Sequence, residues 1–166
     1  MTTAPDAALK SPVEKKPGED QAAAANPLKS VWVGASAGTG KTKVLIDRVL
    51  RLMLPRDGMG VESATRPEKV LCLTFTKTAA AEMSNRIYRD LAKWAVVDEG
   101  TLIKDLTALL HVPPTAETVQ EARRLFARVL DTPGGLKIMT IHSFCQSVLK
   151  RFPVEAGLPP YFDLMD

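Results

Sequence analysis

The sequence predicts an α/β fold in which helices pack against a parallel β-sheet. Three short apolar runs of strand length, at residues 29–34, 69–75 and 137–141, are each followed by a segment with helical periodicity. Strands that alternate with helices in this way pair in parallel, because each helix carries the chain back to the start of the next strand. A composition of 45% hydrophobic and 25% charged residues is that of an ordinary globular domain.

The first apolar run leads into a glycine-rich turn and then a helix. The turn, residues 35–42, reads Ala-Ser-Ala-Gly-Thr-Gly-Lys-Thr. Gly38 and Gly40 allow backbone conformations closed to other residues, so successive N–H groups can converge on one anion at a helix N-terminus. Lys41 can reach the β- and γ-phosphates of a nucleotide, and the Thr42 hydroxyl can take one position on a Mg²⁺ ion. The turn is therefore predicted to be a phosphate-binding loop.

The helix after this loop spans residues 41–54 and is expected to bury one face. The expected face consists of Leu45, Val49 and Leu52. The second apolar run leads into a longer amphipathic helix from about Thr78, whose apolar residues recur at spacings of three and four and so form one buried stripe. The stripe consists of Ala80, Met83, Ile87, Leu91 and Trp94.

Two more helical segments, residues 101–110 and 115–130, interrupt the alternation as an insertion over about residues 95–133. A third strand and a last helix, over about residues 142–151, resume it. No apolar run ending in Asp-Glu follows, so the metal-holding and water-orienting carboxylates of a nucleotide hydrolase are missing. We therefore expect a fragment of a larger protein that hydrolyses little nucleotide by itself.

Composition and the N-terminus narrow the class further. Residues 1–20 have too few aliphatic side chains to offset their ordering entropy, so they are predicted to form a disordered tail before a domain over residues 21–166. The chain has no run near the roughly 20 apolar residues that span a bilayer and no secretory signal, so we expect no membrane partner and a cytoplasmic location. Cys72 and Cys145 lack metal-ligand neighbours and are expected to be small core residues. A net charge of +3 is compatible with a nucleic-acid partner.

Polar and aromatic residues follow the second and third strands. Parallel strands end at one edge of the sheet, which is where ligands bind in open α/β folds. Hydroxyls and helix N-terminal N–H groups suit phosphates, and an exposed ring suits an unstacked base. The residues alone leave the choice open, because Thr74 and Thr76 could equally cap a helix, Phe75 could be core, and His142 could be structural.

Three stretches, in this order, resemble the superfamily 1 DNA helicases of the UvrD/Rep class. Residues 35–42 resemble the Walker A motif of that class, which has alanine in the position of Ala35 in place of the usual first glycine. Residues 73–83, LTFTKTAAAEM, are similar to its motif Ia, and residues 140–144, TIHSF, are similar to the DNA-contacting motif that follows.

The resemblance extends over nearly all of residues 21–153. Gln21, twenty residues before Lys41, lies where the class has its adenine-reading glutamine. Residues 140–146 and 158–162 are most similar to the AddA branch, the RecB-like helicase–nuclease subunit of double-strand break repair.

The resemblance implies a P-loop NTPase with a RecA-like parallel sheet and flanking helices, of which this chain holds part of domain 1A. The insertion then begins subdomain 1B. ATP and Mg²⁺ are the implied cofactors, Lys41 the catalytic residue, and Thr42 the metal ligand. The implied ATP site is Gln21, Ala35, Ser36, Ala37, Gly38, Thr39, Gly40, Lys41 and Thr42. The implied DNA-binding residues are Thr74, Phe75, Thr76, Thr140, His142 and Ser143.

The implied partners are single-stranded and double-stranded DNA and, in the full-length protein, a second, AddB-like protein. Two other classes stay open. A small P-loop phosphotransferase would need an arginine-bearing lid after the loop and would have no use for a Thr-Phe-Thr segment at the sheet edge. A non-catalytic module that binds nucleotide or DNA is the other alternative.

Overall fold

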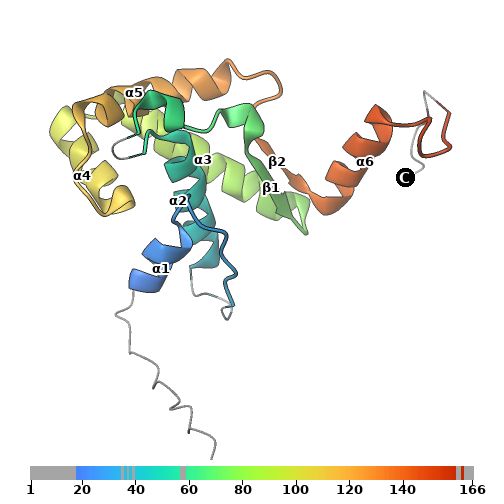
Figure 1. Cartoon of the computed structure of the whole chain (residues 1–166), viewed down its shortest axis with the longest axis horizontal. Coiled ribbons are helices and arrows are strands. Elements are labelled where there is room, and N and C mark those ends of the chain that lie inside the picture. The colour runs from blue at the N-terminus through green and yellow to red at the C-terminus, as the bar shows by residue number, and fades with distance from the viewer. Residues whose placement is uncertain are drawn as a thin grey trace, which may run out of the picture.

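The computed structural model describes residues 18–34, 36, 38, 40–56, 59–159 and 162, and the structural statements below refer to these residues. Helices dominate, and a small sheet lies between the main group of helices and the last helix (Figure 1). In chain order the elements are α1 (Glu19–Ala24), α2 (Lys41–Met53), η1 (Val61–Ser63), η2 (Pro67–Lys69), β1 (Leu71–Thr74), α3 (Lys77–Val96), α4 (Glu99–Leu110), α5 (Ala116–Leu130), β2 (Lys137–Thr140) and α6 (Ile141–Arg151).

The sheet consists of β1 and β2, which pair in parallel within the described residues. Leu71 pairs with Lys137 at one end and Thr74 with Thr140 at the other. The three helices between these strands provide the long crossover that parallel pairing requires. The predicted parallel α/β arrangement is confirmed for the second and third strands; a RecA-like sheet around a P-loop is not established by two strands.

The predicted first strand is wrong in this structure, because residues 29–34 form no strand. An apolar run becomes a strand only if another strand offers it an edge and its faces are covered, and β1 pairs only with β2 among the described elements. Here the segment runs along α2 instead, and the Trp32 side chain is 95% exposed.

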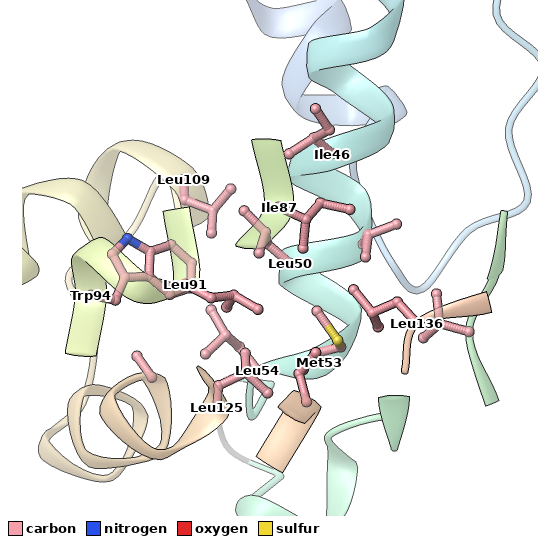
Figure 2. Packing of buried hydrophobic residues seen from close by; sticks show 14 of the residues in the cluster. Ile46, Leu50, Met53, Leu54, Ile87, Leu91, Trp94, Leu109, Leu125 and Leu136 are labelled. Carbon is pink, nitrogen blue, oxygen red and sulfur yellow. The ribbon is translucent and has the colours of Figure 1, made fainter. Parts of the chain in front are cut away.

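The core lies between α2, α3, α4 and α5, and Figure 2 shows its packing. The predicted stripe of α3 is confirmed, because all five of its residues are buried. In α2 the prediction holds only for Val49, since Leu45 is exposed and Leu52 half-buried. The helix packs against α1 as well as against α3 and α4, so its buried residues are Val44, Ile46, Val49, Leu50 and Met53.

Four helices begin with a side-chain cap that the sequence supplies. The side chains of Thr76, Asp98, Thr115 and Thr140 each accept a hydrogen bond from a backbone N–H one turn into α3, α4, α5 and α6, respectively. Such bonds satisfy amides that the first turn of a helix leaves without partners. These caps set the starts of both helices that follow the strands.

The two ends of the chain depart from their predictions in part. Residues 1–17 of the predicted tail lie outside the described residues, and α1 already begins at Glu19. Helix α6 extends away from the rest of the protein and buries none of its residues (Figure 1). Cys145, on α6, is therefore exposed, and the prediction that it is a core residue is wrong. Cys72 is half-buried and packs against the core. No helix in the described part of the chain is long and apolar enough to cross a membrane.

Candidate functional site

Two described glycines of the turn before α2 have backbone conformations that suit anion binding. Gly38 has a φ of 79° and Gly40 a φ of 85°, both in the left-handed region that favours glycine. A Cβ on Gly38 would meet no atom within 4 Å, so the backbone conformation rather than crowding calls for glycine there. Three of the predicted loop residues, Ala35, Ala37 and Thr39, lie outside the described residues.

Lys41 is the first residue of α2, and its side chain folds back over the turn. Its Nζ donates to the Ser36 carbonyl at 2.5 Å, so the ammonium group lies above the loop rather than along the helix. Thr42, the next residue, is exposed. A cation, a helix N-terminus and two left-handed glycines together fit a nucleoside triphosphate. Thr42 could offer a Mg²⁺ ion one hydroxyl ligand. No cluster of three or more His, Cys, Asp or Glu side chains in the described ranges could hold a metal by itself.

Gln21 lies against this turn, although twenty positions separate it from Lys41 in the sequence. Its Nε2 is 3.4 Å from the place where a Cβ would stand on Gly40. Helix α1, which carries Gln21, packs on α2 through Ala24, Ala25 and Val44. The structure thus brings together Gln21 and Gly40, which were predicted separately to contact the same nucleotide.

A cavity of about 480 Å³ opens beside Lys41, between α2 and the segment that precedes the turn. Most of its wall is apolar, and Lys41 and Arg48 are its cations. The lining residues are Ala24, Ser30, Val31, Val33, Lys41, Val44, Leu45 and Arg48. Lys41, at the start of α2, therefore borders an open space.

The predicted DNA residues gather at the edge where β1 and β2 end. Thr74 and Thr140 are direct partners in the parallel register, so two segments 66 positions apart meet there. The Thr74 hydroxyl donates to the Thr76 carbonyl at 2.9 Å, and the Thr76 hydroxyl accepts from the Ala79 N–H at 3.1 Å. Between them the Phe75 side chain is 88% exposed. An aromatic ring so exposed beside two helix N-termini is available to stack on a planar ligand.

The second half of this edge is more closed. Thr140 is only 7% exposed, and its hydroxyl accepts from the Ser143 N–H at 3.1 Å and lies 2.9 Å from the Ser143 hydroxyl. His142, in the first turn of α6, is exposed. Thr140 therefore acts as a helix cap in this structure, whereas His142 and Phe75 face solvent.

Two arginines of α2 that the sequence prediction missed contact α1 and the segment that follows it. Arg48 and Arg51 donate to backbone carbonyls of α1 and of the residues after it. Burial lowers the pKa of Arg51, although Asp47 opposes this effect. Hydrogen bonds to main-chain carbonyls leave no residue pattern in the sequence. The sequence feature that corresponds to them is a pair of basic residues three positions apart, on a helix that follows an alanine run.

Comparison with known proteins shows the family of the chain. The family described as the UvrD/REP helicase N-terminal domain matches residues 17–166. Among curated proteins, the A subunit of the ATP-dependent helicase/nuclease of Limosilactobacillus fermentum is 35% identical over 153 residues, which cover 90% of this chain. The proteins of the same name from Bacillus pumilus and Clostridium botulinum are 33% and 34% identical and cover 83% and 82% of the chain. The chain spans only 9% of the length of each of these three relatives.

Proposed function

The chain belongs to the UvrD/REP helicase family, and on that basis we propose that it is the ATP-binding N-terminal part of a DNA helicase that moves along single-stranded DNA. Its relatives are named as parts of ATP-dependent helicase/nucleases, which supports ATP as the nucleotide and DNA as the polymer. The proposal includes the repair of double-strand breaks and an AddB-like protein as the partner. A RecA-like arrangement of the whole sheet and a cytoplasmic location stay predictions.

One observation favours a helicase over a phosphotransferase. The register that pairs Thr74 with Thr140 places the exposed Phe75 ring and the N-termini of α3 and α6 at one sheet edge. A small phosphotransferase uses a phosphate loop but has no need of this second surface. A surface with hydroxyls, helix N-termini and an exposed ring suits a phosphate backbone with unstacked bases.

At the nucleotide site, each residue has a role that follows from its position. The N–H groups of the turn and of the first turn of α2 would hold the phosphate oxygens, and the Lys41 ammonium would neutralise charge on the transferring γ-phosphate. The Thr42 hydroxyl would take one position on Mg²⁺. Gln21 would read the adenine edge, because one amide both donates and accepts. ATP, when bound, supplies the free energy of its hydrolysis for movement.

The proposal is tested by replacing Lys41 in the full-length product of the gene. We expect the wild type to hydrolyse ATP, with single-stranded DNA stimulating the rate, and Lys41→Ala to reduce hydrolysis to background. The variant should stay folded, because the exposed Lys41 side chain contributes nothing to the core. Lys43→Ala is the matched control, since Lys43 is also exposed and pairs with Asp47, one turn further along α2.

Two results would contradict the proposal. Near-normal turnover by a folded Lys41→Ala variant would exclude the turn as the ATP site. An ATP hydrolysis rate of the wild type that single-stranded DNA does not change, together with phosphate transfer to a small acceptor, would favour the phosphotransferase.

A further inference from the structure

Arg48 holds the backbone that follows α1. Its Nη1 donates to the carbonyls of Ala24 at 3.2 Å and Asn26 at 2.6 Å, and its Nη2 donates to the carbonyl of Lys29 at 2.6 Å. Arg51, one turn further along α2, donates from Nη1 to the Ala22 carbonyl at 3.2 Å. One guanidinium thus binds three backbone carbonyls within residues 24–29.

Helix α1 depends on such support. It has only six residues, whereas isolated helices of fewer than about 12 residues are marginal in water. Its buried apolar contact with α2 involves only small or medium-sized side chains in the described residues, namely Ala24, Ala25 and Val44. The last carbonyls of a helix have no intrahelical partner and form the negative end of its dipole. A guanidinium at that end therefore stabilises the helix both by hydrogen bonds to these carbonyls and by its positive charge.

The position of Gln21 follows from this arrangement. Gln21 lies one turn before Ala24 on α1, and its Nε2 is 3.4 Å from the Cβ position of Gly40. Arg48 lies two turns into α2, whose N-terminus is at Gly40. The guanidinium therefore joins the helix that carries Gln21 to the helix that carries the phosphate-binding turn.

We propose that Arg48 is a positioning residue for recognition of the nucleotide base: it fixes Gln21 beside the phosphate-binding turn and so sets the preference for adenine. The inference rests on the proposed roles of the turn and of Gln21. Arg48 lines the cavity beside Lys41, but its hydrogen bonds go to protein carbonyls, so it acts through α1. Arg51, with one carbonyl, has a smaller part in the same role.

Arg48→Lys tests this without removing the charge. A lysine ammonium is a single point of donation and lacks the planar fork that reaches three carbonyls. Binding constants for ATP and GTP, without hydrolysis, are measured by fluorescence for the full-length wild type, Gln21→Ala, Arg48→Lys and the double variant. Arg89→Lys is the control, because Arg89 is exposed on α3 and, within the described residues, its ion pair is a 3.9 Å contact with Asp90.

We expect Gln21→Ala to reduce the ratio of the GTP to the ATP dissociation constant by about 2- to 12-fold, the range of one neutral hydrogen bond. Arg48→Lys should reduce the same ratio by a similar factor, and Arg51→Lys by less. The double variant should lose no more than Gln21→Ala alone, since both substitutions remove one interaction. Binding of inorganic triphosphate should stay unchanged, because the turn itself is intact.

Amide hydrogen exchange without nucleotide supplies a second readout. Arg48→Lys should speed exchange at Ala22, Ala25 and Asn26, whose N–H groups donate to the carbonyls of Gly18, Gln21 and Ala23. Unchanged exchange, or an unchanged base preference despite faster exchange, would overturn the inference while leaving the ATP site in place. A wild type that binds ATP and GTP equally would also overturn it. A wild type that binds neither nucleotide nor triphosphate would instead refute the proposed function.

Discussion

Removal of the Phe75 ring is the sharpest test of the DNA surface. The side chain is 88% exposed and stands between Thr74 and Thr76 at the sheet edge. A ring that contributes so little to the core can be replaced by alanine with almost no loss of folding free energy. Any change in DNA binding then reports on the surface and not on the fold.

The expected magnitude follows from what the ring can do there. Stacking of one base on an aromatic side chain contributes about 1–3 kcal/mol. Phe75→Ala should therefore raise the dissociation constant for single-stranded DNA by about 5- to 150-fold. Phe75→Leu should lose nearly as much, because leucine keeps the apolar volume but offers no planar face, whereas Phe75→Trp should bind at least as tightly as the wild type.

Fluorescence anisotropy on mixed-sequence oligonucleotides, repeated at several salt concentrations, provides the assay. The loss should be similar on every sequence and at every salt concentration, because Phe75 neutralises no phosphate and leaves the salt slope unchanged. Val96→Ala is the control: Val96 is 82% exposed and ends α3, so its removal takes an equally exposed apolar group from the other end of the same 20-residue helix. Wild-type affinity in Phe75→Ala would show that this edge is not the DNA surface, and a changed salt slope would show that the substitution disturbs the phosphate contacts.

Two further predictions concern helix caps. Thr140→Ala should lower the free energy of unfolding in urea by about 0.5–2 kcal/mol, because it removes the cap of α6 and a partner of Ser143. The control Ser147→Ala, on the exposed side of α6, should change it by less than about 0.5 kcal/mol. Equal losses in the two variants would contradict the capping role. Hydrogen bonds from Thr101 lower the pKa of Asp98 below its ordinary value of 3.8. The charged cap should therefore stabilise α4 above pH 3.8 and lose this effect as the pH falls further. The difference in unfolding free energy between wild type and Asp98→Asn should shrink over that acid range, and a difference that stays constant would refute this.

Sequence reasoning succeeded where a periodic pattern and a single burial face coincide. The stripe of α3 from Ala80 to Trp94 was predicted completely, because α3 buries one narrow face against the core. It failed for α2, since that helix has neighbours on two sides and its buried residues spread beyond one stripe. It also failed at residues 29–34, because strand formation depends on a neighbouring edge that local sequence cannot supply.

The candidate site divides in the same way. The Thr-Phe-Thr segment could be predicted, since it ends a strand and begins a helix, and the register of β1 and β2 brings it to Thr140 as expected. The sequence did not distinguish the exposed Phe75 from the buried Thr140, because burial depends on how α6 leaves the sheet. Arg48 could not be predicted at all, since its partners are main-chain carbonyls, which every residue carries.

The packing of α2 against α3 limits how the proposed helicase can work. In Figure 2, Ile46 and Leu50 of α2 lie against Ile87 and Leu91 of α3 in one buried cluster. The phosphate-binding turn precedes α2 and Phe75 precedes α3, so both sites are attached to the same close-packed core. Close-packed cores transmit displacement but do not stretch, so in the proposed helicase ATP bound at Lys41 would leave Phe75 nearly fixed relative to α2. In the proposed helicase, movement along DNA would then need a second body that closes on the nucleotide and binds the strand separately, with this chain as the body against which it moves.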